Sequence, residues 1–112
     1  MSRREVLRLS DIRNAVATIR DHIATGPFDE KTADAVLYNL VVIGEAAAQI
    51  SDETRARAPD IPWTKIVGLR NLIAHEYFRI DLEVIQAIVS EQLDQLDETA
   101  KRLIDEDDEP AT

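Results

Sequence analysis

The feature that most constrains this fold is the helical spacing of apolar residues along almost the whole chain. Near the N-terminus, apolar side chains recur at every third or fourth position, which places them on one stripe of a helix. Similar stretches follow up to residue 103, and no stretch shows the alternation typical of a strand. The sequence therefore predicts an all-α protein. The first stripe consists of Val6, Leu9, Ile12, Val16, Ile19 and Ile23.

Capping residues divide the chain into helices. Ser2 and Glu5 form a capping-box pattern, and Gly26-Pro27 ends the first helix. Asp29 is placed to cap a second helix that runs to about Ile50.

The second half of the chain shows three more helix starts. Ser51-Asp52 begins a short helix that Pro59 closes, and Pro62 suits the first position of a helix that runs to about His75. Asp81 caps the last helix. Short connections between long amphipathic helices predict an up-and-down four-helix bundle with a short extra helix.

The helix that starts at Pro62 is apolar around much of its circumference, so we expect it to lie at the centre of the bundle. Any exposed apolar remainder would lie in a homodimer interface. Gly44 lies inside the second helix, where it destabilises relative to alanine by up to ~1 kcal/mol. We interpret Gly44 as the point where another helix backbone comes very close.

Length and charge bound the function. The 112 residues suit one domain, expected at 1–104, followed by an acidic, disordered tail at 105–112. The net charge is −9, which argues against DNA and other tight non-specific nucleic-acid binding, but residues 53–79 carry +2. A local phosphate site is therefore possible there. There is no cysteine, no signal-peptide pattern and no membrane-length apolar run, so we expect a cytoplasmic protein without disulfides.

Polar chemistry is concentrated between residues 70 and 77. Asn71 and His75 are four residues apart and share a helix face, whereas Arg70 lies roughly 140° round the axis from His75 and would have to reach it. An imidazole, a guanidinium and an amide are the groups that bind a phosphodiester and move a proton on it. On a helix this apolar, Arg70 needs a partner, either a phosphate or a neighbouring acid. Tyr77 and Phe78 could instead be packing residues.

A metal site is not predicted. His22 follows Asp21 on the first helix and has no second ligand at metal-binding spacing, so we interpret it as a surface residue. No cluster of histidine and carboxylate residues appears elsewhere in the sequence. We expect chemistry that needs neither a metal nor another cofactor.

The segment from Arg70 to His75 matches the Arg-x4-His motif of HEPN domains, and His75-Glu76-Tyr77 resembles the HepT subgroup. The resemblance extends over about residues 5–104, with further similar segments in the same order. They are Ile43-Gly44-Glu45-Ala46-Ala47, Ile61-Pro62-Trp63, Gly68-Leu69-Arg70-Asn71, Tyr77-Phe78 and Ile80-Asp81.

This resemblance implies a small all-helical ribonuclease toxin that is paired with a nucleotidyltransferase antitoxin. It implies that His75 acts on the ribose 2′-hydroxyl or the leaving 5′-oxygen, that Arg70 grips the scissile phosphate, and that Asn71 orients one of them. It also implies a homodimer with two motifs facing one cleft, and adenylylation of Tyr77 by the antitoxin. The alternatives are a non-catalytic helical module that binds a nucleotidyltransferase or a nucleotide, and a purely structural dimer.

Overall fold

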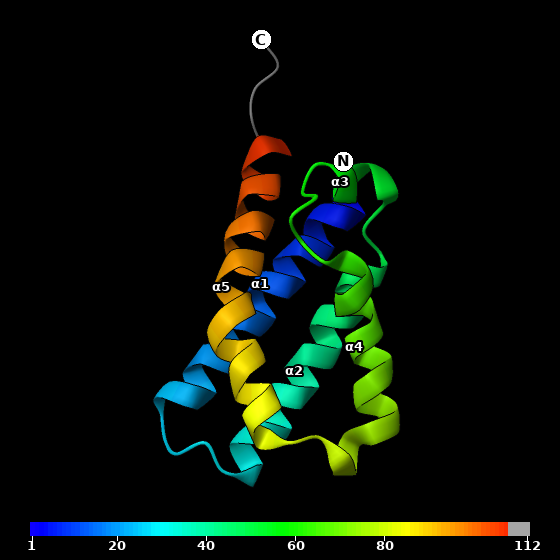
Figure 1. Ribbon diagram of the computed structural model, residues 1–112. Helices are drawn as coiled ribbons and strands as arrows, with labels where there is room; N and C mark the ends of the chain where they lie inside the picture. Colours follow the sequence, from blue (N-terminus) through cyan, green and yellow to red (C-terminus); the bar gives the residue numbers. More distant parts are fainter. Residues whose placement is uncertain (108–112) are drawn as a thin grey trace.

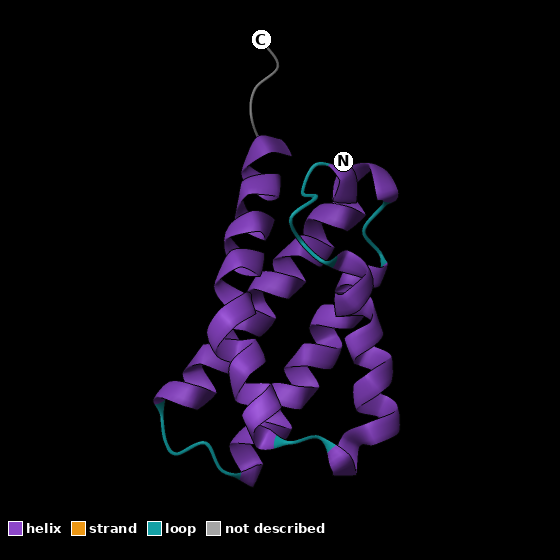
Figure 2. Ribbon diagram, in the orientation of Figure 1, coloured by secondary structure: helices purple, strands orange, loops and turns teal. Residues whose placement is uncertain are grey.

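The computed structural model describes residues 1–107, and these residues form helices and short connections without a strand. The helices run alternately up and down, so that each long helix is antiparallel to the one before it (Figure 1). Loops are confined to the two ends of the bundle (Figure 2). The predicted all-α, up-and-down bundle with a short extra helix is confirmed. Its elements are α1 (Arg3–Ala24), α2 (Glu30–Ala48), α3 (Asp52–Ala56), α4 (Trp63–Glu76), the 3-10 turn η1 (Tyr77–Arg79) and α5 (Leu82–Asp107).

The predicted capping residues begin the first three helices. The Ser2 hydroxyl accepts from the Glu5 amide at 3.1 Å, completing the capping box, and Asp29 accepts from the Thr32 amide at 2.9 Å. Ser51 caps α3 in the same way. Pro62 immediately precedes α4 and is not its first residue.

The C-terminal boundary differs from the prediction. Helix α5 continues through Asp107, so residues 105–107 of the expected tail belong to its last turn. Lys101 and Arg102 pair with Asp105 and Glu106, one turn later, which extends the helix into this acidic stretch. Residues 108–112 lie outside the described part of the chain.

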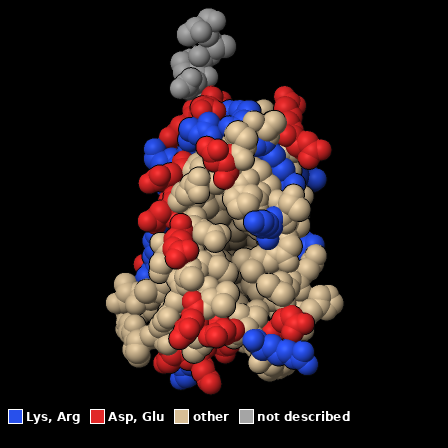
Figure 3. Space-filling model, in the orientation of Figure 1, with Lys and Arg blue, Asp and Glu red and all other residues tan. Residues whose placement is uncertain are grey.

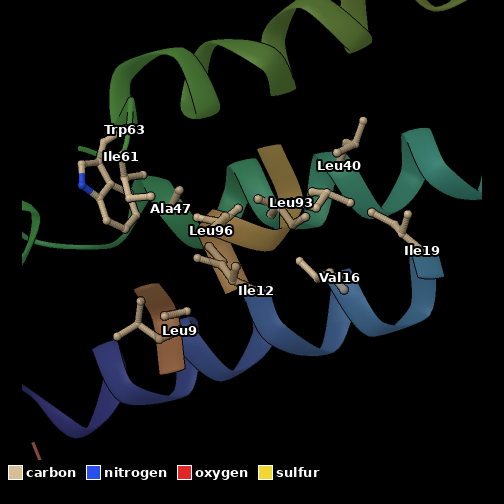
Figure 4. Close-up of a cluster of buried hydrophobic side chains, with 14 of the residues drawn as sticks. Leu9, Ile12, Val16, Ile19, Leu40, Ala47, Ile61, Trp63, Leu93 and Leu96 are labelled. Carbon is tan, nitrogen blue, oxygen red and sulfur yellow. The ribbon is translucent and has the colours of Figure 1, made fainter. Parts of the chain in front are cut away.

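The hydrophobic core is built mainly by α1, α2 and α5. The stripe on α1 faces inward, and side chains of α2 and α5 close over it (Figure 4). Burying each large aliphatic side chain contributes about 1.5–3 kcal/mol relative to leaving it exposed. The largest fully buried side chains are Leu9, Ile12, Val16, Ile19, Val36, Ile85 and Leu103.

The position of α4 corrects the sequence-based expectation. Only Trp63 and Ile73 of this helix are buried, and Leu72 is 52% exposed. Helix α4 packs chiefly against α2 and lies at the edge of the bundle, whereas α2 packs on both α1 and α4 (Figure 1). The apolar residues around α4 indicated that the helix packs against hydrophobic neighbours. They did not indicate how much of its surface these neighbours cover.

Candidate functional site

Gly44 sets how closely α4 approaches α2. A Cβ atom at this position would lie 2.8 Å from the Cβ of Arg70 and 3.2 Å from the carbonyl oxygen of Ile66. Both atoms belong to rigid parts of α4, so any side chain here would push the helix away. The predicted close approach of a second helix at Gly44 is confirmed, and it takes place at the first residue of the polar motif.

Arg70 has an acidic partner within the chain. Its Nη1 lies 3.2 Å from the Oε1 of Glu45, the residue after Gly44, and its Nε donates to the Asn71 Oδ1 at 3.3 Å. The turn of α2 that lets α4 approach at Gly44 therefore also provides, in Glu45, a negative charge for Arg70. Of the two partners expected for Arg70, a phosphate or a neighbouring acid, this structure shows the acid, and Asn71 helps to hold the guanidinium.

His75 lies apart from this cluster. It is exposed near the end of α4, and its imidazole has no hydrogen bond or ion pair within residues 1–107. The α-helix ends at Glu76, one residue later, and continues as η1. The structure thus brings Arg70, Asn71 and Glu45 together, while the imidazole remains open to solvent on the same helix.

Tyr77 is held against α2 by a residue that the sequence analysis did not single out. Its phenol donates a 2.5 Å hydrogen bond to the Oδ1 of Asp34, while the residue remains 39% exposed. This hydrogen bond is the main cause that raises the pKa of Tyr77 above its ordinary value, with desolvation and the Asp34 charge adding to it. Phe78 packs edge-on against the Tyr77 ring and is 96% exposed.

Two polar contacts therefore join α2 to the α4–η1 segment, one on each side of a hollow. The hollow, which we call the α2/α4 trough, has a volume of about 440 Å³, and Asp34 and Tyr77 form one end of its lining. Glu45 lies eleven residues after Asp34, roughly 16 Å along the helix. The apolar part of the trough is formed by Leu37, Tyr38, Val41, Ile73 and Ala74.

Sequence spacing held a signal for both missed acids. Asp34, Tyr38, Val41 and Glu45 recur at steps of four, three and four residues, which is one stripe along α2. The partner of this stripe could not be found from the sequence, because Asp34 and Tyr77 are 43 residues apart.

Comparison with known proteins places the chain. It matches the family described as "Ribonuclease HepT-like" over residues 8–103. The chain belongs to this HepT-like family. A Thermococcus cleftensis protein named as a probable ribonuclease HepT is 32% identical over 79% of this chain and 84% of its own length.

A Methanocaldococcus jannaschii protein named as a candidate RNase is 42% identical over 53% of this chain. That match spans 54% of the M. jannaschii protein, so the chain covers only about half of this relative. No solved structure matches the chain significantly.

A second hollow of the HepT-like chain lies on the other side of α4. This α4/α5 groove, of about 310 Å³, is lined mainly by apolar side chains, among them Ile66, Leu69, Ile88 and Leu96. Figure 3 shows a hollow bordered mostly by uncharged side chains, with a basic side chain on one rim and acidic side chains along the α5 side. None of Arg70, Asn71, His75 and Tyr77 lines it, so the motif of this HepT-like chain faces elsewhere.

The described residues of the HepT-like chain hold neither a cluster of metal ligands nor a membrane-spanning helix. Within residues 1–107, no three histidine or carboxylate side chains gather closely enough to hold a metal ion. His22 is exposed on α1. Across the same residues, every helix is too short or too polar to cross a bilayer.

Proposed function

We propose that this HepT-like chain is a metal-independent endoribonuclease that acts as the toxin of a toxin–antitoxin pair. The observation that carries the proposal is the composition of the C-terminal half of α4. There Arg70 and Asn71 form one cluster, and the His75 imidazole stands exposed and free of protein partners within residues 1–107. These groups suit phosphate binding and proton transfer.

The proposed reaction is an attack of the ribose 2′-oxygen on the neighbouring phosphorus. The bond from the 2′-oxygen to phosphorus forms, the bond from phosphorus to the 5′-oxygen breaks, and the products carry a 2′,3′-cyclic phosphate and a 5′-hydroxyl. One imidazole takes the 2′-proton, and a protonated imidazole gives a proton to the 5′-oxygen. Arg70 pairs with the phosphate and stabilises the charge that builds on it.

Two imidazoles are needed, and one chain has a single histidine in the motif, so we propose a homodimer with a shared cleft. Exposed apolar side chains beside the motif support this assembly. Leu72 lies on α4, Phe78 follows it on η1, and both are largely uncovered. A symmetric contact that covers them would bring two copies of His75 towards one cleft.

Regulation would act through Tyr77. We propose that a partner nucleotidyltransferase transfers adenylyl groups from ATP to its phenol, which is partly exposed two residues after His75. Each group adds negative charge and bulk beside the site, and both oppose the entry of an RNA phosphate. Inhibition would then be covalent and would persist after the partner leaves.

The first test compares cleavage of RNA by the wild type, His75→Ala and Arg70→Ala, with His22→Ala as a matched control for losing a histidine. We expect the His75 and Arg70 variants to lose at least about 100-fold in rate, while His22→Ala cleaves as well as the wild type. Cleavage should continue in EDTA and leave cyclic phosphate ends. Full activity of His75→Ala, or a strict need for a divalent ion, would contradict the mechanism.

A second test addresses the shared cleft. Wild-type and inactive His75→Ala chains are mixed in varying proportion at a constant total concentration and allowed to exchange subunits. If cleavage needs both imidazoles, mixed dimers are inactive and activity follows the square of the wild-type fraction. A linear dependence, or a monomer by sedimentation at micromolar concentration, would argue against a shared site.

The ion pair between Arg70 and Glu45 favours a second candidate function, a non-catalytic module that binds a nucleotidyltransferase. On this interpretation the motif is a structural contact that stabilises the α2–α4 crossing. The two functions separate cleanly. Binding of the transferase without RNA cleavage by the pure wild-type chain supports the module, whereas cleavage that His75→Ala abolishes supports the ribonuclease.

A further inference from the structure

The hydrogen bond between Tyr77 and Asp34 joins two distant parts of the chain at the proposed modification site. Asp34 lies in the second turn of α2, and Tyr77 opens η1. The other tyrosine, Tyr38, lines the same trough and is 70% exposed, but its phenol has no hydrogen bond within residues 1–107. Asp34 therefore distinguishes one of two nearby phenols.

We propose that Asp34 orients the Tyr77 phenol and accepts its proton when a nucleotidyl group is transferred to it. This inference rests on the proposed regulation through Tyr77. It adds a group from this chain to a reaction whose remaining components, the transferase and a nucleoside triphosphate, come from the partner.

The step is a nucleotidyl transfer that releases pyrophosphate. The phenol oxygen attacks the α-phosphorus of the nucleoside triphosphate, a bond from oxygen to phosphorus forms, and the bond to pyrophosphate breaks. The phenol proton passes along the existing hydrogen bond to the Asp34 carboxylate and from there to solvent. A nucleophile within hydrogen-bond reach of its base is the arrangement that such activation needs.

The phenol needs this help because its environment keeps it protonated. The Asp34 hydrogen bond, desolvation and the Asp34 charge all raise the pKa of Tyr77, so the phenolate is scarce near neutral pH. The carboxylate that disfavours the free phenolate is also the group placed to take the proton as the new bond forms. The ring stays partly exposed, which leaves a side from which the triphosphate can approach.

Within residues 1–107, no other acid around Tyr77 is placed to act in this way. Glu30, one turn before Asp34, lines an adjoining hollow together with Tyr77 but has no hydrogen bond to the phenol within residues 1–107. Glu76 lies next to Tyr77 in the chain and pairs with Arg79 at 3.8 Å. Glu30 is therefore a matched control for the loss of a nearby negative charge.

The experiment measures the rate at which purified chain gains nucleotidyl mass from Mg-ATP and the proposed partner nucleotidyltransferase. The variants are Asp34→Asn, Asp34→Glu, Glu30→Gln and Tyr77→Phe. Asparagine keeps an oxygen that can accept the phenol hydrogen bond but cannot take the proton. We expect Asp34→Asn to react at least about 100-fold more slowly at pH 7, Asp34→Glu to recover part of the rate, and Glu30→Gln to match the wild type.

A pH series distinguishes a proton acceptor from a merely structural contact. Without a base, the reaction depends on the phenolate, so the rate of Asp34→Asn relative to the wild type should rise about tenfold per pH unit below the phenol pKa. A structural defect would lower the rate by the same factor at every pH. Dividing by the wild-type rate removes the pH dependence of the transferase itself. The other charged groups near the phenol, Glu30, Glu76 and Arg79, are identical in both proteins.

A titration without the transferase tests the contact itself. In a Tyr38→Phe background, Tyr77 is the only tyrosine, and its ionisation can be followed by ultraviolet absorbance. Asp34→Ala, which removes both the hydrogen bond and the charge, should shift the pKa of Tyr77 down towards 10.0, the ordinary value. An unchanged titration would overturn the inference even if modification takes place.

The outcomes separate the two proposals. If the wild type gains no nucleotidyl mass, or gains it on Tyr77→Phe as well, the proposed regulation through Tyr77 fails and this inference falls with it. If Tyr77 of the wild type is modified and Asp34→Asn reacts equally fast, only the role of Asp34 is wrong. Slow modification of Asp34→Asn that recovers with rising pH supports both.

Discussion

The three-helix core and the edge helix of this protein are stabilised in different ways. Helices α1, α2 and α5 bury continuous stripes of aliphatic side chains against one another. Helix α4 fully buries only Trp63 and Ile73 and packs the half-buried Ile66, Val67 and Leu69 against the core. The Gly44 crossing and the Arg70–Glu45 pair add single contacts. The residues from Arg70 to Tyr77 of the candidate site lie on α4 and η1, and only their acidic partners Asp34 and Glu45 lie on α2. Changes that abolish the site can therefore leave the core folded, whereas core changes affect both.

The largest difference between the two regions should appear when matched leucines are shortened. Leu9→Ala empties a fully buried position on α1, and we expect it to lower the free energy of unfolding by about 2–5 kcal/mol. Leu72→Ala on α4 removes a side chain that is half-exposed in the single chain, and at concentrations where the chain is monomeric it should change this free energy by less than about 0.5 kcal/mol. Urea denaturation followed by circular dichroism measures both. Equal losses would mean that α4 is covered as fully as the core.

A polar core contact gives the next largest effect. Glu5 is buried, and its carboxylate accepts from the Ser51 amide at 2.6 Å and from the Ser2 amide at 3.3 Å. Removing this charge in Glu5→Gln leaves two amides with a weaker acceptor, so we expect a loss of about 1–3 kcal/mol at neutral pH.

The same residue predicts a pH dependence. Desolvation raises the pKa of Glu5, but the hydrogen bonds from Ser51 and Ser2 outweigh it and hold the pKa below the ordinary 4.5. The stabilisation that a lowered pKa provides is fully present above the pKa of the unfolded chain. It is lost as the pH falls through the pKa of the folded protein. The difference between wild type and Glu5→Gln should thus shrink below about pH 4.5. A constant difference from pH 7 to pH 3 would show that the carboxylate charge is not responsible.

Gly44→Ala should affect the site more than the core. The added Cβ would meet rigid atoms of Arg70 and Ile66, so α4 has to shift. Overpacking should lower the free energy of unfolding by about 1–3 kcal/mol, and the higher helix propensity of alanine should restore up to ~1 kcal/mol of it. We therefore expect a net loss of about 1–2 kcal/mol. Displacing Arg70 should reduce RNA cleavage about 100-fold. Thermal unfolding and a cleavage assay on the same preparation test this, and an active Gly44→Ala would show that the crossing does not position the site.

The smallest expected effect is a gain. Gly68 lies on α4, and a Cβ added there would meet nothing within 4 Å. Gly68→Ala should stabilise the protein by about 0.5–1 kcal/mol, because alanine restricts the unfolded chain and favours the helix. It serves as the matched control for Gly44→Ala, since both variants add one methyl group to a helix. A melting temperature below that of the wild type would mean that the outer face of α4 is more crowded than the structure shows.

Local patterns predicted the helices and their caps because these depend on residues close in sequence. The capping box at Ser2 and Glu5 was correct, but the bond from Ser51 to Glu5 was missed because it spans 46 residues. The same limit applied to Arg70, whose need for a partner was clear from its apolar neighbours. Its choice of Glu45 depended on how α4 crosses α2, and spacing within one helix does not contain that information.

The peripheral position of α4 was missed for a related reason. Periodicity measures how apolar a helix is, whereas burial depends on how much surface its neighbours present. Leu69 faces the open α4/α5 groove, although its spacing alone suits a core position. An amphipathic pattern alone therefore could not distinguish a central helix from an edge helix.

The Arg70–Glu45 pair has a consequence for how RNA binding should respond to salt. An arginine that meets a phosphate normally displaces condensed cations, and affinity for single strands falls with a slope of about −0.7 per contact on logarithmic axes. Here the phosphate has to replace a carboxylate that is already in place. The released Glu45 attracts cations of its own, so fewer ions are set free in total. Arg70 should therefore contribute less to the ionic-strength dependence of affinity than an arginine without a partner, and Glu45→Gln should steepen that dependence while tightening binding.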